Sequence, residues 1–170
     1  VEDVPRLDFD VADADSPALS VGRNLAADEH ERAAPAARGR RAVPQGEAVK
    51  AGGKAGEFRA AAEASLAASR WNAAGLDAIH AGIAAGDAAL IASAGKRSVS
   101  KDHYDVVGML AEAEPAFLGP QQRQLTGLLK TKNSVAYEQR LLTEMDARRL
   151  FDHARRFLRW SASVVGTNAD

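Results

Sequence analysis

The sequence predicts an all-α protein, an antiparallel four- to five-helix up-and-down bundle that follows a disordered or loosely packed N-terminal tail. The hydrophobic fraction is 46% of 170 residues, and much of it is Ala, which is the best helix former and is depleted in strands. From Glu57 onward, apolar residues recur every three to four positions, as on one face of a helix. Pro and Gly divide this region into segments joined by short loops, which is typical of antiparallel bundles.

Residues 1–54 differ in composition from the rest of the chain. Short acidic and basic clusters alternate there, aromatic residues are almost absent, and prolines interrupt the segment at Pro5, Pro17, Pro35 and Pro44. Such a composition cannot bury enough apolar surface to offset chain entropy. We therefore expect a tail over 1–54 and a helical bundle over 55–166, with a hinge at Gly52, Gly53 and Gly56.

The bundle divides into five expected helices. Gly95 suits the left-handed position that ends a helix, and Pro115 stops the next one. Ser100 is a candidate N-cap, and Glu144 with Asp146 gives the last helix an acidic first turn. The expected ranges are 58–70, 71–94, 101–114, 121–137 and 143–165, where the second helix either continues the first or starts after a short turn.

A stripe of small residues marks the second helix, with glycines at positions 75, 82 and 86. Glycine inside a helix costs up to ~1 kcal/mol relative to Ala. The stripe therefore indicates a neighbour that approaches closely, although loose use of Gly is an alternative. His80 in the same helix is interpreted as a boundary histidine that Asp77 could hydrogen-bond.

Composition and charge exclude several classes of function. The net charge is −1, so strong global steering toward nucleic acid is not expected. The absence of Cys excludes disulfides and thiolate metal sites, and we expect neither a metal site nor a cofactor. No uninterrupted apolar run approaches the roughly 18 residues of a membrane span, and no signal-peptide pattern is present. A cytoplasmic protein without membrane contact is expected.

The last expected helix has the clearest amphipathic pattern and carries arginines on its polar side. One interpretation is a solvated helix face with an i,i+4 pair between Asp152 and Arg156. The other is a stripe that contacts phosphates, because the arginine fork matches phosphate oxygens. The arginines are Arg148, Arg149, Arg155, Arg156 and Arg159. Lys132 lies near the core-facing stripe of the preceding helix, where it either snorkels to solvent or lines a groove.

Four stretches in a fixed order resemble a known family. They are R-W-N-A-A at 70–74, A-I-H-A-G-I-A-A-G-D-A-A-L at 78–90, L-L-K-T-K-N-S-V-A-Y-E at 128–138 and D-A-R-R-L-F-D-H-A-R-R-F-L at 146–158. Together they resemble the HEPN (higher eukaryote and prokaryote nucleotide-binding) domain family, in its short actinobacterial single-domain form. The resemblance covers about residues 57–165.

Active members of that family are metal-independent endoribonucleases that use an Arg, a following polar residue and a His. Lys132 and Asn133 align with the Arg and the polar residue, and Tyr137 stands where the His would be. Lys holds a phosphate as a point charge and not bidentately. Tyr, with a pKa of about 10, is a poor general base at neutral pH. The motif is degenerate, no residue is assigned as catalytic, and we expect ribonuclease activity to be weak or absent.

The resemblance implies a non-catalytic module that binds RNA or a nucleotide in a groove lined by Lys132, Asn133 and Tyr137. The nearby arginines expected to contact phosphate are Arg148, Arg155 and Arg159. The resemblance also implies a homodimer and a small nucleotidyltransferase partner, as in a toxin–antitoxin-like pair. Two alternatives stay open: a structural bundle that dimerises or docks a partner through the glycine stripe, and a weak ribonuclease that uses Lys132 and Tyr137.

Overall fold

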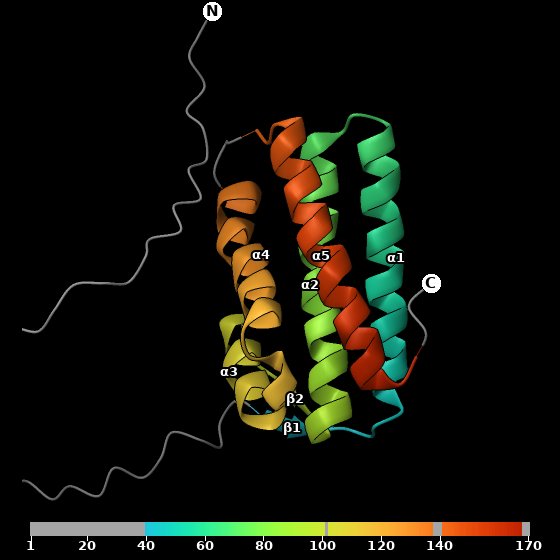
Figure 1. Cartoon of the computed structure of the whole chain (residues 1–170), viewed down its shortest axis with the longest axis vertical. Coiled ribbons are helices and arrows are strands. Elements are labelled where there is room, and N and C mark those ends of the chain that lie inside the picture. The colour runs from blue at the N-terminus through green and yellow to red at the C-terminus, as the bar shows by residue number, and fades with distance from the viewer. Residues whose placement is uncertain (1–39, 101, 138–140, 168–170) are drawn as a thin grey trace, which may run out of the picture. The chain divides into compact units, whose positions relative to one another are not determined.

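The computed structural model describes residues 40–100, 102–137 and 141–167, and the side chains of Asn133, Ser134, Ala136 and Tyr137 are outside that description. The described residues belong to one compact unit, residues 37–170. They form an antiparallel bundle of α-helices (Figure 1), so the predicted all-α fold is confirmed. The helices are α1 (Glu47–Ala67), α2 (Trp71–Ala94), α3 (Tyr104–Ala113), α4 (Pro120–Tyr137) and α5 (Glu144–Val165).

Helix α2 is the centre of the bundle. It contacts α1, α3, α4 and α5, whereas α1 and α4 do not contact each other. Helices α1 and α4 therefore lie on opposite flanks of the layer formed by α2 and α5 (Figure 1). The expected bounds of α2 are confirmed, and the helix ends at Gly95 in the predicted left-handed conformation, with φ 61°.

The glycine stripe of α2 makes this central position possible. A Cβ on Gly82 would overlap Leu128 of α4, and a Cβ on Gly75 would overlap Leu142. A Cβ on Gly86 would lie 3.3 Å from Val106 of α3. The predicted close approach is confirmed, and the approaching neighbours belong to the same chain.

Helix α1 begins eleven residues before the predicted range of 58–70. It starts at Glu47 and runs through Gly52, Gly53 and Gly56 without a break, so the expected hinge and the expected boundary between residues 54 and 55 are wrong. Burial of Ala48 and Ala55 against the bundle offsets the low helix propensity of the glycines, because tertiary packing supplies most helical stability in proteins. The expected tail over 1–39 lies outside the described residues.

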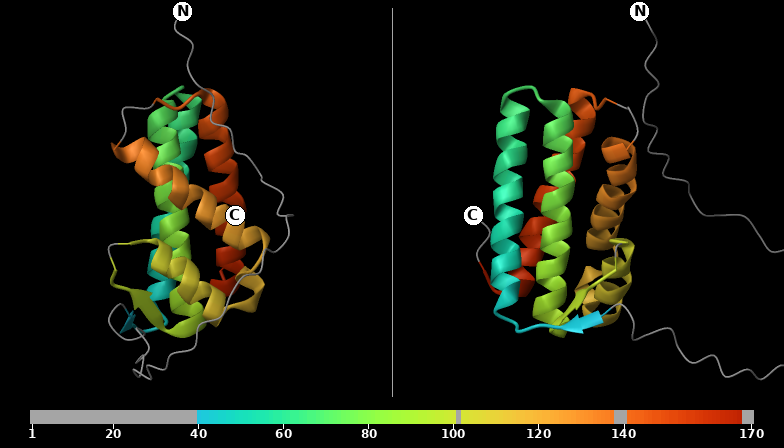
Figure 2. Two further views of the ribbon diagram at one scale, coloured as in Figure 1. Left: turned by 90° about the vertical axis from the view of Figure 1, so that its left-hand side faces the viewer. Right: turned by 180° about the vertical axis from the view of Figure 1, so that it is seen from behind.

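A two-stranded antiparallel ribbon closes one end of the bundle. Strand β1 (Arg40–Ala42) pairs with β2 (Lys96–Ser98), which directly follows α2. The ribbon lies at the end of the bundle where α2 ends (Figure 2). The sequence did not predict it, because each strand is only three residues long and the two are far apart in the chain.

Helix α3 begins at Tyr104, with His103 as its N-cap in place of the predicted Ser100. Ser100 Oγ accepts a hydrogen bond from the Asp102 amide, and the Asp102 carboxylate accepts one from the Tyr104 amide at 2.9 Å. Two consecutive side-chain turns thus hold the segment before the helix, as short polar side chains commonly do. Lys101 lies outside the described residues.

Helix α2 also meets the length and composition of a membrane span, with a mean hydropathy of 1.2 over its most apolar window. It is the single such helix among the described residues, and the sequence analysis did not anticipate it. Within the bundle 72% of that window is buried. This burial is what the core helix of a bundle shows.

Candidate nucleic-acid interface

Helix α5 presents one packed face and one arginine-rich face. Its N-terminus is fixed by a capping box, in which Thr143 Oγ1 accepts from the Asp146 amide at 3.2 Å and the Asp146 carboxylate accepts from the Thr143 amide at 3.2 Å. Leu150, Ala154 and Phe157 are buried against the bundle. The helix therefore sits with a fixed rotation, and its arginines face outward.

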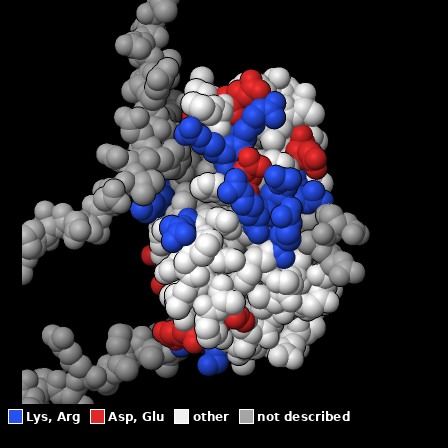
Figure 3. All heavy atoms as spheres, in the orientation of Figure 1, with Lys and Arg blue, Asp and Glu red and all other residues white. Residues whose placement is uncertain are grey.

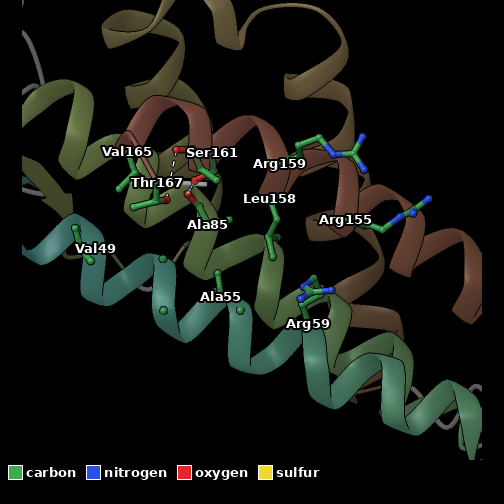
Figure 4. Close-up of a pocket in the computed structure, with 14 residues that line it drawn as sticks. Val49, Ala55, Arg59, Ala85, Arg155, Leu158, Arg159, Ser161, Val165 and Thr167 are labelled. Carbon is green, nitrogen blue, oxygen red and sulfur yellow. Dashed lines mark hydrogen bonds between the residues drawn. The ribbon is translucent and has the colours of Figure 1, made fainter. Parts of the chain in front are cut away.

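A groove runs between α5 and α1, with Ala85 of α2 at its floor (Figure 4). Its volume is about 530 Å³. Ser161 of α5 is buried beneath it and donates a hydrogen bond to the Ala85 carbonyl oxygen at 2.7 Å, which joins the two helices there. The groove's apolar walls include Val49, Leu158 and Val165.

Three arginines from two helices line this groove, and the side chains of Arg155 and Arg159 project outward from α5 at its rim (Figure 4). Arg59 comes from α1, and Arg155 and Arg159 come from α5. Figure 3 shows basic side chains gathered over the face where α5 and α1 lie, with a few acidic side chains among them. The pattern of the last helix predicted Arg155 and Arg159 as phosphate ligands but not Arg59, because nothing in the sequence indicated that α1 would pack beside α5.

The acidic partners of these arginines bind them weakly. Arg59 lies 3.6 Å from Glu63, and Arg155 lies 3.3 Å from Asp152. No carboxylate of the described residues lies within 4.0 Å of Arg159. Exposed ion pairs of this kind contribute roughly 0–1 kcal/mol and are screened by salt. The guanidinium groups thus remain available for a phosphate.

Three glycines of α1 form the opposite wall of the groove. Gly52, Gly53 and Gly56 all line it, and a Cβ added to any of them would meet no heavy atom within 4 Å. Packing therefore does not require glycine at these positions, although each costs the helix up to ~1 kcal/mol relative to Ala. Their effect on the structure is to keep the groove wide.

Two details of the predicted arginine stripe need correction. Arg148 does not line the groove, because it pairs with Glu144 of its own helix at 2.8 Å. Asp152 pairs with Arg155 and not with the predicted Arg156. Both are pairs between neighbouring turns of α5, at i,i+4 and i,i+3. This part of the arginine stripe is therefore a solvated helix face, which is one of the two interpretations of the sequence.

The predicted motif on α4 is not brought to these arginines. Lys132 lies on α4, on the flank of the bundle that α1 does not touch. Asn133 and Tyr137 fall in α4 as well, but their side chains lie outside the described residues. Lys132 does not line the groove that Arg155 and Arg159 border, and a site that combines all three stays a prediction.

Lys132 instead lies near two histidines. Burial lowers the pKa of His80, and the charge of Lys132 lowers it further, while Asp77 acts in the opposite direction. Burial and Lys132 likewise lower the pKa of His103. Both imidazoles are thus neutral at pH 7. The sequence analysis treated His80 as a lone boundary residue, and it missed this proximity because α2, α3 and α4 had to be packed first.

The face proposed for the structural alternative is not available. The glycines of α2 at positions 75, 82 and 86 are buried, and leucine and valine side chains of the same chain fill the space beside them. A partner could not reach this stripe without unfolding the bundle. Dimerisation through the glycine stripe of α2 is therefore contradicted.

The described residues contain no group of three or more His, Asp or Glu side chains that could hold a metal ion. The chain matches no known protein family, no curated protein and no solved structure. A functional conclusion therefore depends on the geometry of the chain itself.

Proposed function

We propose that the chain is a non-catalytic, HEPN-like module that binds single-stranded RNA through phosphates held in the groove between α1 and α5. The observation that carries the proposal is that three arginines from two helices, Arg59, Arg155 and Arg159, line one groove, whose α1 wall includes glycines that packing does not require. The resemblance of residues 57–165 to HEPN domains is consistent with it and is part of the same proposal.

The chemistry of the groove favours phosphate over other anions. Guanidinium groups bind phosphate oxygens with paired, charge-assisted hydrogen bonds. The three arginines come from two helices, so a phosphate or two successive phosphates can be held from both sides. A groove of about 530 Å³ with apolar walls at Val49, Leu158 and Val165 also has room for part of a nucleotide.

The expected affinity is modest and depends on salt. The net charge of the chain is −1, so attraction comes from the local arginines and not from the protein as a whole. Among the described residues that line the groove, none is an aromatic side chain on which a base could stack. Binding should therefore depend little on base sequence.

A fluorescence anisotropy titration with a labelled single-stranded RNA, repeated over a series of salt concentrations, tests the proposal. Arg155→Gln and Arg159→Gln should each weaken binding about tenfold. Each should also reduce the slope of log K against log salt by about 0.7. Arg148→Gln is the matched control, because it removes the same charge from the same helix outside the groove. Absence of binding at low salt, or an equal loss in Arg148→Gln, would contradict the proposal.

A second candidate, a weak metal-independent ribonuclease, is favoured by the charge of Lys132, which together with burial lowers the pKa of the imidazoles of His80 and His103. One imidazole could take a proton from a ribose 2′-hydroxyl while Lys132 holds the phosphate. Cleavage of RNA in EDTA that His103→Asn abolishes and Arg159→Gln preserves would favour this candidate over the first.

The HEPN resemblance adds proposed partners in a cytoplasmic setting: a second copy of the chain and a small nucleotidyltransferase, as in a toxin–antitoxin-like pair. Light scattering after size-exclusion chromatography tests the homodimer. A mass of about 17.9 kDa over the whole concentration range would identify a monomer and exclude it.

A further inference from the structure

A second groove, separate from the first, lies where the β-ribbon meets the start of α1. Its volume is about 440 Å³, and it shares no lining residue with the groove between α1 and α5. Four cationic side chains from three elements line it, with Glu47 as the one acidic side chain in the lining. The cations are Arg41 of β1, Lys50 and Lys54 of α1, and Arg97 of β2.

The register of the ribbon places two of these cations directly opposite each other. Arg41 pairs with Arg97 across the strands, and residues opposed in this way project from the same face of a sheet. Like charges directly opposite each other destabilise a strand pair. The ribbon therefore carries a repulsion on the face that borders the groove.

On the other face of the ribbon, Arg40 is paired with an acid of the same chain. Arg40 projects from that face, since side chains alternate along a strand. Its guanidinium group donates two hydrogen bonds to the Glu112 carboxylate, at 2.9 and 3.2 Å. In β1, Arg40 is thus paired with an acid, whereas the next residue, Arg41, lies opposite a second arginine.

The acids near the groove neutralise only part of its charge. Arg97 pairs with Asp87 at 3.2 Å, and Lys50 pairs with Glu47 at 2.7 Å. No carboxylate of the described residues lies within 4.0 Å of Arg41 or Lys54. Lys54 has instead its ammonium group 5.8 Å from the centre of the Phe58 ring. Two cations beside the groove thus lack an anionic partner in the described part of the chain.

Backbone hydrogen bonds fix the positions of the elements that carry these cations. The Val43 amide donates to the Gly95 carbonyl oxygen at 2.9 Å, which ties the chain after β1 to the end of α2. The Glu47 amide donates to the Pro44 carbonyl oxygen at 3.0 Å at the start of α1. Like charges held in place by the backbone are relieved best by an anion that bridges them.

We propose that this groove is a binding site for a phosphate-bearing anion that spans several cations, of the polyphosphate class. Arg41 and Lys54 are the principal ligands, and Arg97 and Lys50 contribute from opposite sides. The shared chemistry is a run of phosphate groups, which either a free polyphosphate or the backbone of a nucleic acid supplies. The site goes beyond the RNA groove proposed above and does not depend on it.

Isothermal titration calorimetry of the full chain with sodium tripolyphosphate, at about 0.1 M salt so that long-range attraction is screened, tests the site. Arg41→Gln and Lys54→Gln should each weaken binding about tenfold. Lys96→Gln is the matched control, because Lys96 neighbours Arg97 but pairs with Ala42 and projects from the other face. It should change the affinity less than about twofold. No saturable binding, or an equal loss in Lys96→Gln, would overturn the proposal.

Thermal unfolding separates a ligand role from a structural one. Without ligand, Arg41→Gln should keep or raise the Tm, because it removes the repulsion from Arg97. With tripolyphosphate at a concentration well above the wild-type Kd, the Tm of the wild type should rise more than the Tm of the variant. A lower Tm of ligand-free Arg41→Gln would show that the arginine supports the fold, and would overturn its assignment as a ligand.

Two further binding experiments identify the source of the phosphates. They also distinguish this site from the RNA groove between α1 and α5. The Arg155→Gln/Arg159→Gln variant should keep a saturable tripolyphosphate site that Arg41→Gln weakens, and loss of all binding in the double variant would overturn a separate site. Single-stranded RNA that competes with tripolyphosphate in this variant would identify a nucleic-acid backbone as the occupant. Absence of competition would identify a free polyphosphate, and both results support the site.

Discussion

Helices α1 and α2 each contain three glycines, but the two sets have opposite surroundings. In α2, the glycines at 75, 82 and 86 face side chains from the rest of the bundle at or inside van der Waals distance. In α1, the glycines at 52, 53 and 56 face open space and line a groove. The glycines of α2 thus allow close packing in the core, whereas those of α1 border a groove at the surface.

The difference indicates which glycines have a role beyond folding. Those of α2 allow leucine side chains of the same chain to come close to its backbone, so packing explains them. Those of α1 reduce helix propensity and gain no contact in return. A local cost at positions where packing does not require glycine is expected at functional sites, and here it coincides with three arginines around one groove.

The largest expected effect is overpacking in α2. Gly82→Leu places a side chain in the space that Leu128 fills, in a core without room for both. We expect the free energy of unfolding to fall by about 3 kcal/mol. Urea denaturation monitored by circular dichroism measures it, with Gly53→Leu in α1 as the matched control. Equal destabilisation of the two variants would remove the distinction between the glycine sets.

A smaller effect of opposite sign is expected in α1. Gly53→Ala adds a methyl group that meets no atom within 4 Å, and it raises helix propensity. The free energy of unfolding should increase by up to ~1 kcal/mol. A decrease in the same urea experiment would show that α1 needs glycine at this position for its own conformation.

The smallest expected effect on stability concerns His153, whose imidazole packs beside Gly127 of α4. Burial lowers the pKa of His153, and Arg156 lowers it further. The folded protein therefore disfavours the protonated ring. The stabilising contribution is complete above the unfolded pKa of about 6.5, and it is lost as the pH falls through the folded value. Urea denaturation at pH 7 and pH 5.5 should show a smaller loss of stability for His153→Asn than for the wild type. An identical loss of stability in the two proteins would contradict a role of His153 in the pH dependence.

The elements that the sequence predicted are those fixed by local signals. The bounds of α2 follow from its long apolar segment and from Gly95, and the start of α5 follows from Thr143 and the acids after it. Such features depend on residues within one or two helical turns of each other.

The parts that were missed depend on contacts between distant segments. The first turns of α1 were assigned to the tail because Gly52 and Gly53 disfavour a helix locally, and only packing against the bundle offsets this. The site was half predicted, since Arg155 and Arg159 follow from the pattern of α5. Arg59 could be assigned to the groove only once α1 was known to pack beside α5. The position of Lys132 outside the groove likewise depends on where α4 packs.

The most direct test of the account is the RNA affinity of Gly56→Leu. This substitution places an apolar side chain at the wall of the groove and changes no charge. Gly108→Leu is the matched control, because Gly108 lies in α3, faces open space and is outside the groove. The account predicts that Gly56→Leu keeps or raises the stability of the fold and weakens single-stranded RNA binding about tenfold, while Gly108→Leu binds like the wild type. Wild-type affinity in Gly56→Leu would contradict it.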